Sequence, residues 1–462
     1  MNLAILQPVT GPEAAQPYRD EVAALGAALL DRGHRVSLTV LASCDETALA
    51  RLADDRPDLI LLYVESLAAD LAFRIAGALT MVRGVPLIAF GPHARLQPDA
   101  CLSMPGAEAV AVGPADFTIP DYVAARQHSL DHLRAPGLWV KLETGVMRNP
   151  PARPPRSLDG LPAPARHLYP SDRIIDPTGF VRVDAARGGD GVPLAAAGDA
   201  PADWSAAAWP VLHRPVDSVL QEMQQLAEVY WDLAGFRIGN ERWASRLEWL
   251  AEFTPRYARE VALPLRTTLR AADVTADTAA LLARTGCKEV RLPVGSGSAL
   301  IRSDILGMDL SPETAEAAFA ALRKAGIRSV ALVELGAPYE TPDSLRQTVD
   351  FLRRVDPDLV EAGLHFPAPG TPSYKVAKEN GWLVPDPAAA HLAGQPSVAL
   401  PRLTADDLLL ARESLPYAVH RPRIVPLIRT ARRVRIGKWG TLYDLVVKPF
   451  LGPPLRRSTK NR

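Results

Sequence analysis

The feature that most constrains the fold is an alternation of short apolar runs with helix-like stretches across residues 1–135. Five runs have the length and apolar character of buried strands: 3–6, 35–40, 59–64, 86–90 and 109–112. Between them, residues 18–32 and 67–83 have helical spacing, and Gly33 and Gly84 stand where helices would end. Strands that alternate with helices predict an α/β domain with a doubly wound, parallel sheet.

Candidate binding residues follow from this sheet. In such a sheet, ligands bind beyond the carboxyl ends of the strands, where the connections change direction. Glycine at a strand end also suits a tight turn, and a loop histidine can cap a helix, so each candidate has a structural alternative. The candidates for cofactor binding are Gln7, Pro8, Ser66, Gly91, Pro92, His93, Gly113 and Asp116.

Five short motifs in this region, in order, resemble those of the cobalamin-binding domain of cobalamin-binding radical-SAM proteins. They are Arg32-Gly-His34, Arg56-Pro-Asp58, Gly91-Pro-His-Ala94, Gly106-Ala-Glu-Ala-Val110 and Val112-Gly113. The resemblance implies a Rossmann-like domain over residues 1–135 that holds the nucleotide tail of cobalamin. A D-x-H-x-x-G motif, whose histidine would coordinate cobalt, is absent after the first strand, and Pro114-Ala-Asp116 replaces the E-G-E of the family.

Residues 136–175 are rich in proline and are predicted to form a linker. The pattern of residues 176–400 predicts a second α/β domain. Six strand-and-helix units can be counted, with strands near 180–184, 235–238, 263–270, 289–294, 329–335 and 359–366. That pattern predicts a partial (β/α)6 barrel, in which active residues follow the carboxyl ends of the strands. The resemblance to radical-SAM proteins continues here through Thr268-Leu-Arg270, Ser296-Gly-Ser298, Ala325-Gly-Ile327 and Phe366-Pro-Ala-Pro-Gly-Thr371.

The loop after the first barrel strand lacks the cysteines of this family. There the loop typically reads S-R-G-C-x-x-x-C-x-x-C, and its three thiolates hold a four-iron cluster whose open iron site binds S-adenosylmethionine. Here Ala186-Arg187-Gly188 keeps the beginning, but the cysteine positions fall on Gly189, Pro193 and Ala196. Cys44, Cys101 and Cys287 are scattered along the chain. The sequence therefore predicts that the four-iron cluster is absent, and it does not decide whether S-adenosylmethionine binds.

Charged residues are also missing near the predicted barrel strand ends. Gly295 stands where the family has an acidic residue, Met308 stands at a usually basic position, and Ile238-Gly-Asn240 replaces a pair of acids. Glu340 is predicted to cap a helix that starts at Thr341. The polar residues that we predict to be catalytic are Arg187, Arg214, Arg270 and His365, with a salt bridge or a helix-end contact as the alternative for each.

Composition limits the remaining choices. With 48% hydrophobic residues, 23% charged residues and a formal net charge of zero, the chain gives no global reason to expect a nucleic-acid partner. We find no signal peptide and no run of about 18 apolar residues, so we expect a cytoplasmic protein. Residues 401–462 are predicted to form a helical, basic tail, either a solvated face or a contact for an anionic partner or membrane surface.

Two classes of function follow. The first is a cluster-free, corrinoid-dependent enzyme that transfers a methyl or alkyl group to a small-molecule substrate, or rearranges that substrate. The second is a non-catalytic corrinoid carrier, a sensor, or a pseudoenzyme partner of an active radical-SAM enzyme. Loss of the cysteine positions together with nearby acids is what relaxed selection on the chemistry would leave, which suits the second class. We nevertheless expect the first class, with the second as the alternative.

Overall fold

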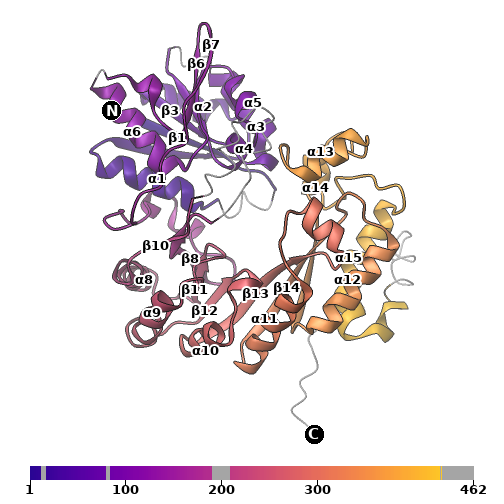
Figure 1. Ribbon diagram of the computed structural model, residues 1–462. Coiled ribbons are helices and arrows are strands. Elements are labelled where there is room, and N and C mark those ends of the chain that lie inside the picture. The colour runs from indigo at the N-terminus through magenta and orange to yellow at the C-terminus, as the bar shows by residue number, and fades with distance from the viewer. Residues whose placement is uncertain (12–16, 80–83, 129, 190–208, 427, 429–462) are drawn as a thin grey trace. The chain divides into compact units, whose positions relative to one another are not determined.

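The computed structural model describes the whole chain except residues 12–16, 80–83, 129, 190–208, 427 and 429–462 (Figure 1). By its contacts, the chain divides into two compact units. Unit 1 comprises Met1–Ala234 and Ala368–Thr371, and unit 2 comprises Gly235–Pro367 and Pro372–Arg462. The segment from 176 to 234, which was predicted to belong to the barrel, is grouped with unit 1 by this division.

Unit 1 is built on a seven-stranded sheet with the strand order β2-β1-β3-β4-β5-β6-β7. The first five strands are parallel, as predicted for a doubly wound sheet. They are β1 (Asn2–Pro8), β2 (Arg35–Leu41), β3 (Leu59–Tyr63), β4 (Leu87–Phe90) and β5 (Ala107–Ala111). The order reverses between β1 and β3, and this switch point is where ligands bind in flavodoxin-like sheets.

An antiparallel hairpin completes the sheet of unit 1. It consists of β6 (Leu138–Leu142) and β7 (Gly145–Arg148), and β6 pairs with β5. These residues were predicted to lie in the Pro-rich linker, and that part of the prediction is wrong. Leu138, Trp139 and Val140 are buried and extend the core, and no proline lies between Pro136 and Pro150, so nothing in the hairpin breaks a strand.

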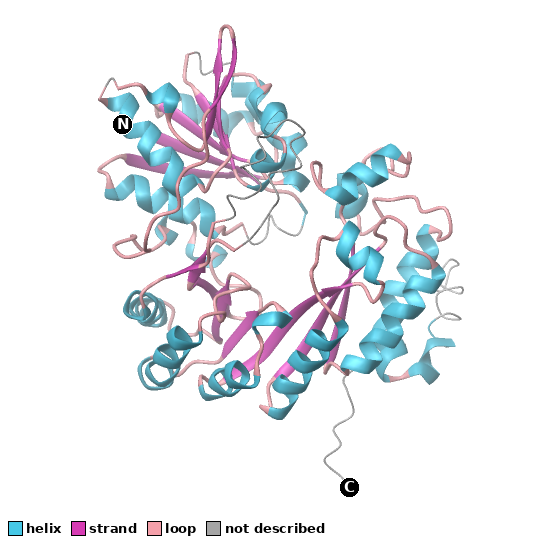
Figure 2. Cartoon of the chain, in the orientation of Figure 1, coloured by secondary structure: helices cyan, strands magenta, loops and turns pink. Residues whose placement is uncertain are grey.

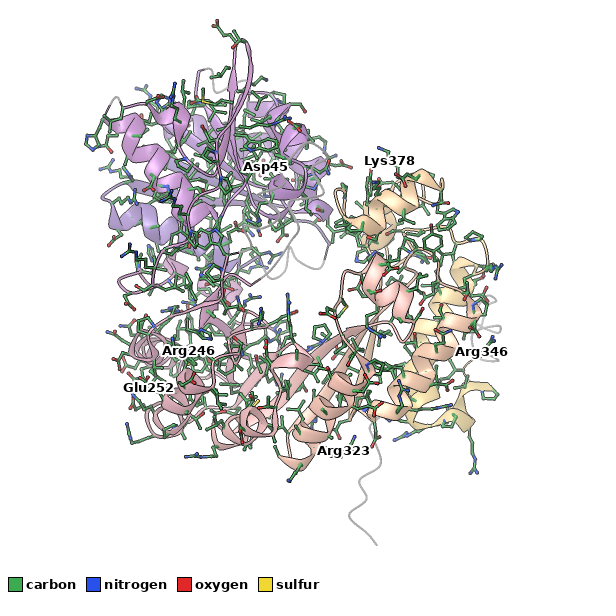
Figure 3. The ribbon with its side chains drawn as sticks, in the orientation of Figure 1. Asp45, Arg246, Glu252, Arg323, Arg346 and Lys378 are labelled. Carbon is green, nitrogen blue, oxygen red and sulfur yellow. The ribbon has the colours of Figure 1, made fainter. Side chains whose placement is uncertain are left out.

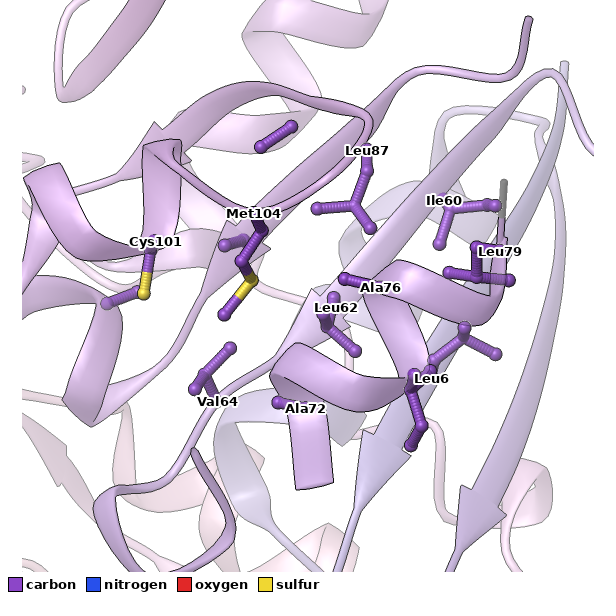
Figure 4. Packing of buried hydrophobic residues seen from close by; sticks show 14 of the residues in the cluster. Leu6, Ile60, Leu62, Val64, Ala72, Ala76, Leu79, Leu87, Cys101 and Met104 are labelled. Atoms are coloured by element: carbon purple, nitrogen blue, oxygen red, sulfur yellow. The ribbon is translucent and has the colours of Figure 1, made fainter. Parts of the chain in front are cut away.

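Both faces of this sheet are covered, which explains why its strands are continuously apolar. On one face, Leu6, Ile60 and Leu62 pack against helix α3 (Ala69–Ala78), as Figure 4 shows. The intervening residues Leu3 and Ile5 are equally buried. The remaining helices are α1 (Asp20–Asp31), α2 (Glu46–Asp54), α4 (Pro92–Leu96), α5 (Pro98–Leu102) and α6 (Ala115–Gln127).

The last elements of unit 1 are short strands and one long helix. Strand β8 (Phe180–Asp184) is followed by the two-residue strands β9 (Ala186–Arg187) and β10 (Leu212–His213), which pair with each other. Helix α8 (Val216–Val229) comes next. Strand β8 is the first of the six strands predicted for the barrel.

All six strands predicted for the barrel belong to one six-stranded sheet, in the order β15-β14-β13-β12-β11-β8. The five strands that fall in unit 2 are parallel to one another. Their bounds are β11 (Gly235–Gly239), β12 (Leu265–Thr268), β13 (Cys287–Gly295), β14 (Arg328–Leu335) and β15 (Leu359–Leu364). The helices, drawn in cyan in Figure 2, are α9 (Leu247–Glu260), α10 (Ala276–Arg284), α11 (Pro312–Lys324), α12 (Pro342–Val355), α13 (Pro372–Glu379), α14 (Pro387–Leu392) and α15 (Ala405–His420).

The two faces of the unit 2 sheet differ in polarity. One face is apolar and buried, with residues such as Ile238, Val290 and Leu292. The register places charged residues in rows on the opposite face, where Arg237 lies beside Arg266 and Glu334 lies beside Gly363. Glu334 and Gly363 are exposed. A polar, open face at the carboxyl ends of parallel strands suits a binding site.

Charged residues lie on the exposed surface of unit 2. The helix predicted at the start of the carboxyl-terminal region is also present. Glu252 of α9 and Arg346 of α12 are exposed, as is Arg246, the residue that precedes α9 (Figure 3). Helix α15 begins after its cap Thr404. Most of the basic residues of the tail lie outside the described residues. In the part of the chain that is described, no helix has the length and hydropathy needed to cross a bilayer.

Candidate functional site

Gln7 and Pro8 lie at the carboxyl end of β1, next to the switch point of the unit 1 sheet. Gln7 is fully buried, and both ends of its amide are bonded within the chain. Its Nε2 donates to the carbonyl of Pro17 at 2.5 Å, and its Oε1 accepts from the hydroxyl of Tyr169 at 2.6 Å. These bonds join the end of β1 to Pro17 and Tyr169, and a role for Gln7 in cofactor binding stays a prediction.

Ser66 and His93 meet at the ends of the neighbouring strands β3 and β4. The Ser66 hydroxyl lies 3.0 Å from Nδ1 of His93. Burial lowers the pKa of His93 to about 4, although Asp70 acts in the opposite direction. The imidazole is therefore neutral at neutral pH. The structure thus brings together two of the predicted cofactor-binding residues as a neutral pair.

Gly91 is explained by the packing of its own loop. Its φ is +107°, and a Cβ would lie 2.8 Å from the ring of Tyr63 and 2.9 Å from the carbonyl oxygen of Val64. Only glycine fits this position. Pro92 begins α4, and Gly113 is less constrained, since a Cβ there would lie 3.1 Å from Thr118.

Asp116 and Arg187 form a buried pair in unit 1. The guanidinium Nη2 of Arg187 lies 3.6 Å from Oδ2 of Asp116. Burial raises the pKa of Asp116, and the charge of Arg187 opposes that rise. Burial alone would lower the pKa of Arg187, but Asp116 and further carboxylates outweigh it, so the net shift is upward. The structure thus joins a predicted cofactor-binding residue to a predicted catalytic one.

The loop that carries the cysteine positions is closed at its base. Gly188 and Gly189 have φ of +76° and +75°, and the Gly189 N–H donates to the Trp209 carbonyl at 2.9 Å. A Cβ on Gly188 would lie 2.4 Å from the Pro210 carbonyl oxygen. Gly189 occupies the first cysteine position, and its positive φ is a backbone conformation that disfavours any side chain. Pro193 and Ala196 lie outside the described residues.

Arg214 belongs to a buried ion network in unit 1. Its Nη1 bonds Oε2 of Glu222 at 2.5 Å and the carbonyl of Asp184 at 3.0 Å. The other carboxylate oxygen of Glu222 pairs with Arg166. These contacts give Arg214 a structural function, and its catalytic role stays a prediction. The sequence analysis missed Arg166, because nothing in a Pro-rich stretch signals a buried arginine.

His365, one of the predicted catalytic residues, forms a close polar pair with Glu334 in unit 2. Nδ1 of His365 lies 2.5 Å from Oε2 of Glu334. Partial loss of solvent around the Glu334 carboxylate would by itself raise its pKa. The hydrogen bond from His365 and the nearby rings of His365 and His391 outweigh that effect, so the pKa is lowered. His365 is 7% exposed, and its Nε2 is buried without a hydrogen-bond partner.

Two further residues of unit 2 bear on the site. His391, which the sequence analysis missed, lies near enough for burial and then His365 to lower its pKa. Its Nδ1 is buried without a partner, and its ring centroid lies 5.3 Å from that of Phe366. Arg270, predicted to be catalytic, is exposed and lies 4.0 Å from Glu241.

Gly295 and Met308, the positions of the missing acid and base, are in contact. A Cβ on Gly295 would lie 2.6 Å from Sδ of Met308 and 2.8 Å from Cδ1 of Leu306. The φ of Gly295 is +61°. An apolar contact thus occupies the two positions where the resemblance implies an acid and a base, and a side chain at 295 would require Met308 and Leu306 to move.

Glu340 does not cap the helix, contrary to the sequence prediction. Thr341 caps α12 through a reciprocal pair of bonds with Ser344. Glu340 is instead buried, and its Oε2 accepts from the Gly336 N–H at 2.5 Å. Burial raises its pKa to about 7.

The three cysteines do not come together. Cys101 and Cys287 are buried in different units, and burial raises the pKa of each thiol to about 12, which keeps it protonated. Cys44 is exposed. Within the described ranges, no group of three or more His, Cys, Asp or Glu side chains has the arrangement of a metal site.

Comparison with known proteins agrees with the architecture. No family model matches the chain. An uncharacterized methyltransferase, PH0819 from Pyrococcus horikoshii, is 24% identical over 380 residues, which span 79% of this chain and 77% of that protein. Among solved structures, the radical S-adenosylmethionine methyltransferase TsrM from Kitasatospora setae, with cobalamin and a [4Fe-4S] cluster bound, has a TM-score of 0.65 at 18% identity, covering 91% of this chain and 92% of that one.

A second solved enzyme has the same architecture. OxsB, a cobalamin-dependent S-adenosylmethionine radical enzyme with aqua-cobalamin and S-adenosylmethionine bound, has a TM-score of 0.61 at 16% identity and covers 94% of this chain and 61% of its own. The structural neighbours are thus cobalamin-dependent radical-SAM enzymes. The chain has their fold, a Rossmann-like domain combined with a radical-SAM-like barrel.

Proposed function

We propose that this chain binds a corrinoid and transfers a methyl or alkyl group to a small molecule without an iron–sulfur cluster. The contact between Gly295 and Met308 carries this proposal, because it replaces an acid and a base with apolar packing. Such a joint replacement at a strand end adds to the loss of the cysteines. It supports a site that was remodelled away from the charged cofactor chemistry of the neighbours.

The residues at the strand ends of unit 1 suit a corrinoid in the chemistry of their donors. The periphery of a corrinoid carries neutral amides, and Ser66 with the neutral His93 offers neutral hydrogen-bonding groups. We propose that this pair holds peripheral groups of the corrinoid. A bound corrinoid supplies a cobalt ion that can carry a methyl group. The end of β1 carries Gln7 and therefore offers no imidazole to the cobalt. The amide of Gln7 is bonded to Pro17 and Tyr169.

The proposed division of labour follows the two units. Unit 1 holds the corrinoid, while Arg187 and Asp116 keep a fixed pair of charges in the same unit. The charged sheet face of unit 2 binds the acceptor molecule through residues at its carboxyl ends. TsrM has been solved with tryptophan as its substrate, so we propose aromatic amino acids as the first acceptors to screen.

A corrinoid carrier, a sensor or a pseudoenzyme partner is the second candidate. One observation favours it: Arg187 and Arg214, two of the four predicted catalytic residues, are bonded to carboxylates of the chain itself. A carrier would bind corrinoid and transfer no methyl group to any acceptor.

Titration with hydroxocobalamin tests the proposed binding site. We expect the wild-type chain to bind it stoichiometrically and Ser66→Leu to lose binding, because a bulky side chain would fill the end of the crevice. Ser103→Leu is the matched control, because Ser103 is exposed beyond α5, ahead of β5, at the opposite end of the sheet. Equal binding by wild type and both variants would place the corrinoid elsewhere, and no binding by the wild type would contradict the proposal.

A further inference from the structure

We infer that His365 is the proton acceptor of the unit 2 site and that Glu334 holds its ring in place for this function. The inference rests on the proposed group transfer and adds a role that the transfer needs. It starts from the positions of the two residues. Glu334 belongs to β14, and His365 follows β15 directly, at the carboxyl ends of two paired parallel strands.

The bond between the two side chains determines which ring nitrogen can accept a proton. An ionised carboxylate only accepts hydrogen bonds, so the 2.5 Å contact with Glu334 requires a proton on Nδ1 of His365. The lowered pKa of Glu334 agrees with an ionised carboxylate. In the neutral ring, the lone pair then lies on Nε2.

Nε2 is buried and has no partner, and this points to a ligand. A buried polar atom without a hydrogen bond destabilises the fold, and such atoms are rare in folded proteins. His365 is 7% exposed, so water does not readily satisfy the atom. His391 adds a second unpartnered nitrogen, Nδ1, in the same neighbourhood. Two such atoms suit a ligand that carries two polar groups.

The sheet face beside the pair has room for a ligand. Gly363 is the cross-strand partner of Glu334 and lies two residues before His365. A Cβ on Gly363 would meet only the carbonyl oxygen of Val333, at 3.9 Å. Gly363 and Glu334 are both exposed, so the face is open at this point. A molecule lying over Gly363 would lie beside the strand ends that carry Glu334 and His365.

The chemistry identifies the class of acceptor molecule. When a nucleophilic nitrogen or oxygen that carries hydrogen takes a methyl group, its lone pair forms the new bond to carbon. The methyl donor is electrophilic. The bond between the methyl carbon and the donor breaks, and both electrons of that bond stay on the donor. The proton of the acceptor atom moves to Nε2 of His365. The site therefore fits an amide, an azole or an alcohol, whose proton must leave, better than a tertiary amine.

The test reads the tautomer of His365 without any cofactor or substrate. Two-bond correlation of ring nitrogens and carbon-bound protons in the 15N-histidine-labelled chain distinguishes Nδ1–H from Nε2–H. The chain has nine histidines, and His365→Gln assigns the signal. We expect the wild type at neutral pH to carry its proton on Nδ1 with Nε2 unprotonated. We expect Glu334→Gln to lose this preference.

Glu361→Gln is the matched control. Glu361 lies on the same sheet face, but it pairs with Arg291 and not with His365. We expect its tautomer signal to match the wild type. Protonated Nε2 in the wild type, or an unchanged signal in Glu334→Gln, would overturn the inference. The wild-type spectrum is decisive even if a variant fails to fold, and it is independent of corrinoid binding, so it can fail while the proposed function stands.

Discussion

At the scale of single residues, several buried ionisable groups among the described residues are kept neutral or paired. His93 and Glu340 have pKa values shifted toward the neutral form by burial, while Asp116 faces Arg187. Gly295 extends this trend, because its neighbour Met308 fills the space where the family has charges. The sequence pointed to both positions as departures, but only the coordinates show that they are in contact.

Restoring the acid at 295 should destabilise the fold. Gly295→Glu places a side chain at positive φ and against Met308, at a cost of about 2–4 kcal/mol in the free energy of unfolding. Gly307→Glu is the control, because Gly307 has φ of +65° with nothing within 4 Å of a Cβ. Urea unfolding should show a smaller loss of unfolding free energy for the control than for Gly295→Glu. The double variant that combines Gly295→Glu with Met308→Lys should recover part of that free energy. Equal losses in the two single variants would argue against the packing account.

Glu340 makes stability depend on pH. Its pKa is about 7 in the folded chain, against about 4.3 for an ordinary glutamate. The folded state therefore holds the extra proton between these values, so stability falls as pH rises from about 4.5 to 7, by up to about 3 kcal/mol. Urea unfolding at pH 5 and pH 8 should show a flatter dependence for Glu340→Gln than for the wild type. An identical pH dependence would mean that Glu340 does not titrate in this window.

At the scale of elements, the segment around β8 and α8 is fixed by ions rather than by an apolar core alone. Glu222 of α8 bonds both Arg166 and Arg214, and Asp20 of α1 pairs with Arg182 of β8. Strands and long helices were predictable because their apolar periods are local. The β6–β7 hairpin was missed because the prolines that follow it dominated the composition, and long-range ion pairs leave no local pattern.

Removing the carboxylate of Glu222 should therefore be severe. Glu222→Ala leaves Arg166 and Arg214 buried without their shared partner, which we expect to cost about 3–5 kcal/mol. Glu260→Ala serves as a control, since Glu260 pairs with Arg256 and Arg259 at the surface, and its loss should not measurably change the urea midpoint. A small effect for Glu222→Ala would mean that the network contributes little to the fold.

At the scale of the whole molecule, the motif order predicted the two α/β domains, and the likeness to TsrM and OxsB agrees with that architecture. The site was less predictable. His365 was identified from its position after a strand, whereas its bond to Glu334 and the nearby His391 depend on residues distant in sequence. The sequence alone indicated the missing cysteines, because no cysteine lies between Cys101 and Cys287.

The most direct test of the account is metal analysis with an ultraviolet–visible spectrum. The chain would be purified without oxygen and incubated with hydroxocobalamin, iron and sulfide, and excess reagents would then be removed. We predict one cobalt per chain with a corrinoid spectrum and no bound iron. Four irons per chain with the absorption of a [4Fe-4S] cluster would contradict the cluster-free account, and absence of both metals would contradict the corrinoid site.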